Sequence, residues 1–257
     1  MNPLPVLITV RFRSSRLPGK CLLSFGNFSV LGHCINRALN AGMRPIVCTS
    51  TDPSDDAIIE EAIDLGVEYF RGDLLNKLKR WSSCLEEFQL DRSHIIDGDD
   101  PFFDTDEIVN RFAEFELLKL SLMRTSNRSD SGFASLGMSI TSEFATTLAK
   151  RTEFLVSQDL DVIPWSLLLE ASDNWSIAKD NFLSIDDGFA TRLTLDYEED
   201  YKLLKILAEK FGPTVSRTEL EDFLRFNATI NAINFHRSEE FLSNKRVQLS
   251  RNFRIES

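Results

Sequence analysis

A short basic segment follows the first apolar run of the chain. The stretch "VRFRSSRLPGK" contains Arg11, Arg13, Arg16 and Lys20 and no acidic residue, although the whole chain has a formal net charge of -11. Small residues such as Ser14 let backbone N–H groups approach an anion, and the cations can neutralise several phosphate oxygens. A solvated basic turn is the plainer interpretation. The place of the segment directly after an apolar run instead favours a site for a small, concentrated anion such as a phosphate chain.

A second candidate group is acidic. The stretch "IIDGDDPFF" places Asp97, Asp99 and Asp100 after another apolar run. Mg²⁺ takes oxygen ligands from one or two carboxylates together with phosphate, so acids beside a phosphate-binding loop predict a shared ion. The stretch "RLTLD" ends in Asp196, which offers a further carboxylate but could equally cap a helix. We expect Asp104, in contrast, to cap the helix that follows it.

Alternating strand and helix signals must position these residues. Strands are predicted over 6–10, 45–49, 67–70 and in "HIID", and helices over 31–40, within 50–66, over 74–88 and after "DTDE". This order implies right-handed β-α-β crossovers and a mostly parallel α/β sheet with helices on both faces. Loops that follow such strands lie at the carboxyl edge, where open α/β sheets bind ligands. The basic and the acidic segments should therefore meet at this edge.

The second half has a looser pattern. Strands are predicted in "LSLMRTS" and "FASLGMSI", on either side of the polar loop "SNRSDSG", and in "TRLTLD". A helix is expected over 198–211, and one or two more within 213–257. Since the chain shows no repeat or linker, we expect one domain over 1–257 in which the second half elaborates the first sheet.

Composition excludes several function classes. The net charge of -11 disfavours broad binding to nucleic acid or to an anionic membrane. The four cysteines form no C-x-x-C pair, which disfavours a zinc site and favours reduced thiols. The chain has no apolar run near the length of a membrane span and no signal-peptide pattern at its start. We therefore expect a cytoplasmic protein with no nucleic-acid or membrane partner.

The motifs, in this order, resemble the cytidylyltransferase family that makes CMP-activated acidic sugars. Its branches include CMP-Kdo synthetases, acylneuraminate cytidylyltransferases and spore-coat polysaccharide proteins. "VRFRSSRLPGK" resembles the signature loop of the family, "GDDP" its G-D-x-P metal loop and "RLTLDYEEDYKLL" its second metal segment, while "INAINFH" is similar to the closing segment of spore-coat-type members. The resemblance implies a Rossmann-like nucleotidyltransferase sheet of the kind shared with GT-A glycosyltransferases.

The resemblance also implies a reaction and roles. The expected reaction is Mg²⁺-dependent transfer of CMP from CTP to an acidic sugar of the nonulosonic or octulosonic type, with release of pyrophosphate, by a homodimer. Residues 1–118 would form the nucleotide-binding half, 119–190 an acceptor and dimerisation elaboration, and 191–257 the second metal segment and C-terminal helices. The implied site residues are Lys20 and Arg11 as catalytic groups, Asp99 and Asp196 as metal ligands, and Arg11, Ser14, Arg16, Lys20, Thr51, Asp52, Arg80 and Asp97 as nucleotide-binding groups.

Three departures from the family pattern keep alternatives open. Arg13 stands where the family has Gly or Ala, and Asp100 replaces a small or sulfur-bearing residue. The stretch "DSGFASLGMSI" lacks the acid of the Pro-x-Gly-x-x-Val-Glu pattern of spore-coat-type members. One alternative is a glycosyltransferase that uses Asp97-Gly98-Asp99 as a D-x-D metal motif, although such an enzyme needs no triphosphate cradle. The other is a nucleotide-binding module that has lost its acceptor site.

Overall fold

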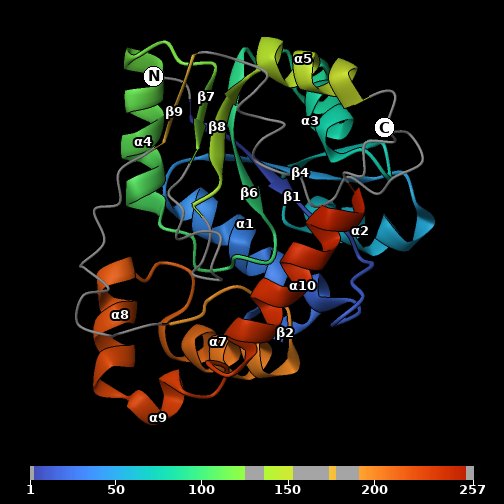
Figure 1. The fold of residues 1–257 in the computed structure, drawn as a ribbon. Coiled ribbons are helices and arrows are strands. Elements are labelled where there is room, and N and C mark those ends of the chain that lie inside the picture. The colour runs from blue at the N-terminus through green and yellow to red at the C-terminus, as the bar shows by residue number, and fades with distance from the viewer. Residues whose placement is uncertain (1–2, 125–135, 153–173, 178–190, 253–257) are drawn as a thin grey trace.

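A seven-stranded sheet organises the protein (Figure 1). The computed structural model describes residues 3–124, 136–152, 174–177 and 191–252. The strand order is β5-β4-β1-β6-β8-β7-β9, and all neighbours are parallel except β6 with β8 and β7 with β8. The strands are β1 (Pro5–Thr9), β4 (Arg44–Ser50), β5 (Glu68–Gly72), β6 (Arg92–Asp97), β7 (Leu122–Arg124), β8 (Met138–Thr141) and β9 (Trp175–Ile177). The predicted mostly parallel α/β sheet is confirmed.

Helices cover both faces of this sheet. Successive residues of a strand point to opposite faces, and the two buried clusters follow this alternation. Val6 and Ile8 of β1 pack with α1 and α2 on one face, and Leu7 packs with α3 and α5 on the other. The helices are α1 (Val30–Asn40), α2 (Asp56–Asp64), α3 (Lys77–Glu87), α4 (Thr105–Leu117) and α5 (Ser142–Thr152).

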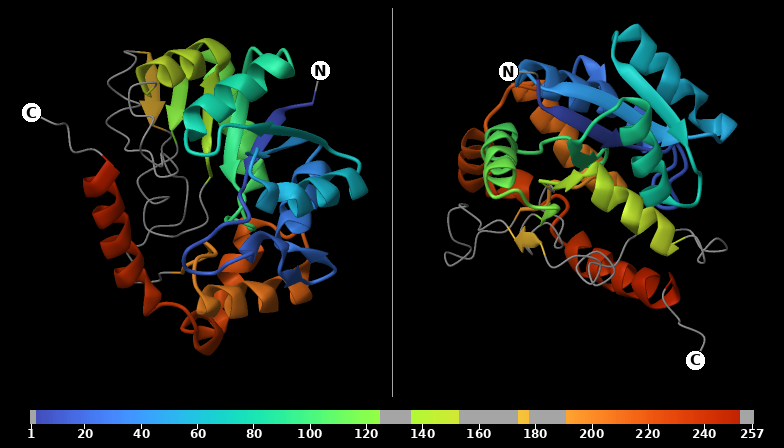
Figure 2. Two further views of the ribbon diagram at one scale, coloured as in Figure 1. Left: turned by 90° about the vertical axis from the view of Figure 1, so that its right-hand side faces the viewer. Right: turned by 90° about the horizontal axis from the view of Figure 1, so that it is seen from above.

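A third hydrophobic cluster lies at one end of the molecule, where α7 (Glu198–Phe211) and α8 (Arg217–Phe226) pack around Phe25, Phe102 and Leu195. Phe25 belongs to a small hairpin of β2 (Ser24–Phe25) and β3 (Phe28–Ser29). The chain continues through α9 (Ala228–Asn231) into α10 (Arg237–Asn252), which leaves this end and runs back beside the body of the molecule (Figures 1 and 2). Within the described residues after 213 there are thus three helices, where one or two were expected.

The predicted strand in "TRLTLD" is wrong. Residues 191–196 are buried but pair with no strand, and their only backbone link to the sheet region that the structure describes is a bond from the Leu195 N–H to the Asp99 carbonyl (2.8 Å). Their alternating leucines resemble a strand because Leu193 and Leu195 fill the third cluster. The third helix also starts later than predicted, at Lys77, because the Asn76 side chain accepts the Lys79 N–H and caps it.

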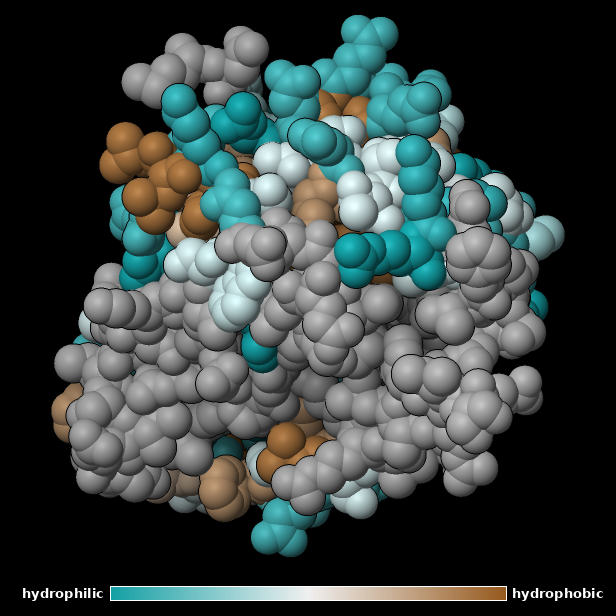
Figure 3. Space-filling view, turned by 45° about the horizontal axis from the view of Figure 1, so that its top comes forward, coloured by the Kyte–Doolittle hydropathy of each residue, from teal (hydrophilic) through white to brown (hydrophobic). Residues whose placement is uncertain are grey.

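The surface carries one apolar feature near α4. Leu117 at the end of this helix is 80% exposed, and Leu118 and Val109 are also exposed; brown side chains gather on this side in Figure 3. Among the described residues, no helix is long and apolar enough to cross a membrane. The loop "SNRSDSG", the first part of "FASLGMSI" and much of the expected elaboration over 119–190 lie outside the described residues. The division of the chain into three functional parts stays a prediction.

Candidate functional site

The basic and acidic loops begin side by side at the centre of the sheet. β1 pairs with β4 on one side and with β6 on the other, so the order of the strands reverses at β1. Ligands of open α/β sheets bind at such a switch point, outside the carboxyl ends of the strands. Thr9 is in register with Asp97, and the Gly98 N–H donates to the Thr9 carbonyl (2.9 Å). The predicted meeting of the two loops follows from this topology.

A buried acid fixes the start of the basic loop. Asp55 is 1% exposed, and its carboxylate accepts the Phe12 N–H (2.7 Å) and the Thr49 hydroxyl (2.9 Å). Further along, Gly19 turns the chain with a φ of 67° and donates its N–H to the Phe12 carbonyl (3.2 Å). This turn begins the 3-10 helix Lys20–Leu22 and directs Lys20 towards the acidic loop.

Lys20 joins the basic loop to two carboxylates. Its Nζ donates to Asp99 Oδ2 (2.7 Å), to Asp196 Oδ1 (3.1 Å) and to the Leu195 carbonyl (2.6 Å). Burial opposes the charge of this ammonium group, but Asp99 and Asp196 outweigh that effect and raise the pKa of Lys20. The structure thus brings together the predicted catalytic lysine and both predicted metal ligands.

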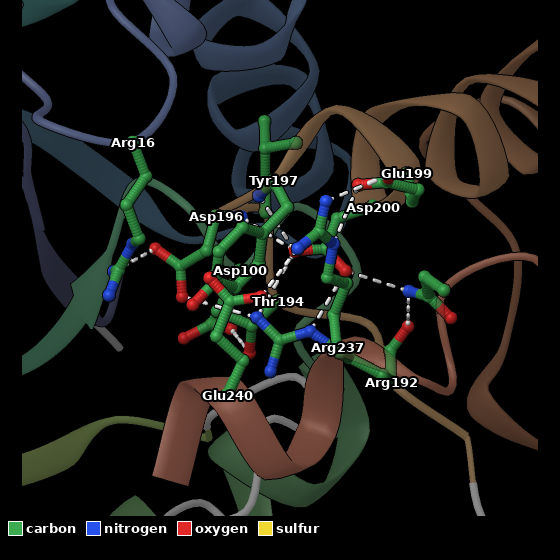
Figure 4. A network of polar contacts seen from close by, with 12 residues as sticks. Arg16, Asp100, Arg192, Thr194, Asp196, Tyr197, Glu199, Asp200, Arg237 and Glu240 are labelled. Atoms are coloured by element: carbon green, nitrogen blue, oxygen red, sulfur yellow. Dashed lines mark hydrogen bonds and ion pairs between the residues drawn. The ribbon is translucent and has the colours of Figure 1, made fainter. Parts of the chain in front are cut away.

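Asp196 is surrounded by cations. Its side chain is 2% exposed; Oδ1 accepts from Arg16 (2.5 Å) as well as Lys20, and Oδ2 accepts from Arg192 (3.2 Å). Figure 4 shows Arg16 on one side of Asp196 and the group around Asp200 on the other. Burial opposes ionisation, but the three cations prevail and lower the pKa of Asp196.

The pKa of Asp99 is shifted upwards, in the opposite direction to that of Asp196. Burial raises its pKa, and the neighbouring carboxylates of Asp196 and Asp97 add to this effect, while Lys20 opposes it. A carboxylate whose proton affinity is raised by nearby anions is also a carboxylate to which an added cation would bind favourably. The carboxylates of Asp196 and Asp97 therefore favour a cation near Asp99, where Lys20 already contacts Oδ2.

The acidic loop supplies a set of oxygen donors for such a cation. One carboxylate oxygen each from Asp97, Asp99 and Asp100 lies within 4.8 Å of the other two. Asp97 also pairs with Lys77 (2.6 Å), and the buried Asp100 accepts the Thr194 hydroxyl (2.6 Å). Oxygen donors of this kind fit Mg²⁺. Asp99 belongs both to this group and to the pair that Lys20 joins.

Two further predicted residues of the basic loop make local contacts. Arg11 donates from Nη1 to the Leu74 carbonyl (2.8 Å), which ties the loop to the segment after β5. The Ser14 hydroxyl accepts the Leu17 N–H (3.4 Å). Both lie on the loop that carries Lys20, and their nucleotide-binding roles stay predictions.

The remaining predicted nucleotide-binding residues lie on neighbouring segments. Thr51 is exposed after β4, and Asp52 beside it accepts the Ser54 N–H and pairs with Arg13 (3.3 Å). Arg80 is 1% exposed in α3 and donates to the carbonyl of Asp73 (2.8 Å). The nucleotide-binding roles of these residues stay predictions.

Sequence reasoning missed the residues that support Asp196. Arg192, Asp200 and Asn234 form a buried polar group around it, and Lys77 pairs with Asp97. The spacing of Arg192 and Asp200, four residues to either side of Asp196, was a usable signal. Asn234 lies far along the chain, and its spacing carries no such signal.

Known proteins resemble the chain across this site. The sequence over residues 6–136 matches the family model of the cytidylyltransferases. The spore coat polysaccharide biosynthesis protein SpsF of Bacillus subtilis is 26% identical over 242 residues, which cover 88% of this chain and 96% of that protein. The 3-deoxy-manno-octulosonate cytidylyltransferase of Colwellia psychrerythraea is 29% identical over 107 residues, 40% of this chain and 38% of its own length.

A solved structure agrees at the level of the fold. The structure of a cytidylyltransferase from Leptospira borgpetersenii superposes with a TM-score of 0.74 at 22% identity and covers 90% of this chain and 97% of its own. The family match includes the basic loop and the acidic loop that meet at the sheet edge. The chain therefore belongs to the cytidylyltransferase family of nucleotidyltransferase enzymes.

Proposed function

We propose that the protein transfers CMP from CTP to an acidic sugar of the nonulosonic or octulosonic type and releases pyrophosphate. The observation that carries this proposal is the contact of Lys20 with Asp99 and Asp196, beside a loop of further cations. The family supports CTP as the nucleotide, and the name of the Colwellia relative includes an octulosonate acceptor. A basic loop that would cradle a triphosphate supports this reaction over the transfer of a sugar out of a nucleotide-sugar, which needs no such cradle.

The basic loop would bind the triphosphate. Arg16 and Lys20 now pair with Asp196, and their side chains are 26% and 13% exposed, so an entering phosphate chain can reach both. Phosphate oxygens would replace Asp196 as their partners, with Arg11 as a third cation. Attack by an acceptor oxygen on the α-phosphorus places charge on the leaving pyrophosphate, and preorganised cations stabilise that charge.

The acids would hold the metal. Asp99 and Asp196 would share Mg²⁺, which when bound stabilises charge on the phosphoryl oxygens and can lower the pKa of the attacking hydroxyl. Asp97 belongs to the acidic loop and pairs with Lys77. We propose that it contacts the nucleotide together with Thr51, Asp52 and Arg80. Residues 119–190 would supply acceptor contacts and a homodimer interface, in a cytoplasmic enzyme.

A pyrophosphate-release screen tests the reaction. The four nucleoside triphosphates would each be combined with nonulosonic and octulosonic acids, with Mg²⁺ or with a chelator. We expect pyrophosphate only with CTP, with one class of acid and with Mg²⁺. Nucleoside diphosphate released from a nucleotide-sugar would instead indicate a glycosyltransferase. Tight CTP binding with no product from any acid would indicate a binding module that has lost its acceptor site.

A further inference from the structure

The two oxygens of the Asp196 carboxylate have different kinds of partner. Oδ1 contacts Arg16 and Lys20, which are partly exposed, whereas Oδ2 contacts Arg192, which is 1% exposed. We propose that Arg192, Asp200 and Asn234 are positioning residues that hold Oδ2, so that Oδ1 alone is presented to the metal. This inference rests on the metal role proposed above for Asp196.

Asp200 holds both Arg192 and the backbone of Asp196. The Arg192 guanidinium donates from Nε to Asp200 Oδ1 (2.8 Å) and from Nη2 to Asp200 Oδ2 (3.1 Å). The backbone N–H groups of Asp196 and Tyr197 both donate to Asp200 Oδ2 (2.9 Å each). Asp200 is 0% exposed and lies in the first turn of α7. One buried carboxylate therefore fixes the main chain of Asp196 and the cation on its side chain (Figure 4).

The closing segment completes this arrangement. Asn234 is 0% exposed, and its Nδ2 donates to Asp200 Oδ1 and to the Arg192 carbonyl (2.9 Å each). From α10, the ring of Phe241 lies 4.4 Å from the Arg192 guanidinium carbon. Arg192 is therefore held between α7 and a segment about forty residues further along the chain, since the two bonds of Asn234 span 34 and 42 residues.

The charges explain why this arrangement suits a metal ligand. Arg192 is shared between Asp196 and Asp200, so it orients Asp196 without neutralising it completely. If phosphate oxygens bind Arg16 and Lys20, Oδ1 of Asp196 loses both of its cationic partners. Oδ2 keeps its hydrogen bond from Arg192. A buried ion pair is weak evidence for added stability, so its role as an orienting device is the stronger explanation. Outer residues that orient metal ligands change metal affinity or activity by about 10- to 100-fold when they are mutated.

The direct test measures how strongly Mg²⁺ tightens the binding of a non-hydrolysable CTP analogue, α,β-methylene-CTP, by calorimetry. The variant is Asn234→Leu, which removes both donors and keeps the number and branching of the side-chain heavy atoms. Asn110→Leu, on the exposed face of α4, is the matched control. We expect Asn234→Leu to reduce the Mg²⁺ tightening by about tenfold or more and to leave binding in chelator unchanged. The turnover of the variant should recover as Mg²⁺ is raised.

Unchanged Mg²⁺ tightening in a folded Asn234→Leu protein would overturn the inference while the proposed function stands. Failure of the wild type to bind the analogue would instead count against the proposed function. If circular dichroism shows that Asn234→Leu is unfolded, the variant Phe241→Leu is used for the same measurement. Phe241 is only half buried, so its replacement disturbs folding less. We expect this variant to lose roughly threefold of the Mg²⁺ tightening through the weaker contact with Arg192, and wild-type tightening would overturn the inference.

Discussion

Two arginines of the basic loop have different surroundings. Arg13 is 70% exposed and contacts Asp52 at 3.3 Å. Arg16 is 26% exposed and lies 2.5 Å from Asp196. An exposed ion pair contributes about 0–1 kcal/mol, so Arg13 acts as a surface partner of Asp52. Arg16 and Lys20 face the acids that the proposed reaction needs.

Single substitutions should distinguish residues that the reaction needs from a residue that only forms a surface ion pair. We expect Lys20→Ala and Asp99→Asn each to lower turnover by about two orders of magnitude or more, because a preorganised charge is lost. Arg13→Ala, on the same loop, should stay within about threefold of the wild type. Pyrophosphate release measures all three, with circular dichroism to check folding. Near-normal release by Lys20→Ala and Asp99→Asn would contradict the assignment.

A buried histidine makes stability depend on pH. His33 is 1% exposed between the rings of Phe25 and Phe102, and burial together with the nearby charge of Arg37 lowers its pKa to about 3. In the unfolded chain the pKa is about 6.5. The unfolded state therefore binds more protons as the pH falls from 6.5 towards 3, and stability is lost over this range.

The variant His33→Phe should remove this dependence and keep an aromatic ring in place. Between pH 6.5 and pH 5, we expect the wild type to lose about 2 kcal/mol more free energy of unfolding than the variant loses. Urea unfolding at the two pH values measures the difference. An equal loss in both proteins would show that His33 is not a buried neutral group.

Among the elements, β8 depends on one glycine. Gly137 precedes β8 with a φ of 72°, and a Cβ added there would lie 1.9 Å from the Ile95 carbonyl oxygen. The first residue of β8, Met138, pairs with Ile95 of β6. Any side chain at position 137 would therefore push β8 away from the parallel part of the sheet.

A comparison with Gly66 separates the steric clash at position 137 from the energetic cost of a positive φ for a residue other than glycine. Gly66 has a similar φ of 67°, but an added Cβ there meets nothing within 4 Å. We expect Gly66→Ala to lower the free energy of unfolding by about 1 kcal/mol and Gly137→Ala by clearly more, over about 3 kcal/mol. Chemical denaturation measures both changes. Equal losses would mean that β8 moves without strain.

Most elements of the first half were predictable, apart from the hairpin of β2 and β3, and parts of the second half were not. Apolar strand patterns alternate with capped amphipathic helices up to residue 117, so local signals agree with the fold. The 191–196 segment has the alternation of a strand, but its leucines pack on α7 and none of the strands that the structure describes adjoins it. The basic and acidic loops could be located from the strands before them. The role of Asn234 could not be predicted, because only the tertiary structure brings this residue to Arg192.

At the scale of the molecule, Arg37 connects the sheet region to the end where α7 and α8 pack. From α1 it donates to the carbonyls of Phe103 (2.6 Å), Pro213 (2.9 Å) and Val215 (2.8 Å), and it is 2% exposed. A buried carbonyl without a donor destabilises the folded state by about 1–3 kcal/mol. This single side chain therefore fixes the acidic loop and the segment between α7 and α8 to the same helix.

Loss of this connection should destabilise the whole chain. We expect Arg37→Met to lower the free energy of unfolding by about 3 kcal/mol or more. The control Arg44→Met, which removes a partly exposed pair with Glu68, should lower it by about 1 kcal/mol or less. Urea unfolding followed by tryptophan fluorescence compares the two variants. A similar small effect of both would refute the connecting role of Arg37.

The transfer of the α-phosphorus tests the central claim most directly. CTP labelled at that atom would be incubated with Mg²⁺ and the acidic sugar that gives the highest pyrophosphate release. The account predicts that the label enters a CMP-sugar product in a one-to-one ratio with pyrophosphate, and that Asp99→Asn loses both together. Label that never leaves CTP with any acid, from a folded protein that binds CTP, would contradict it.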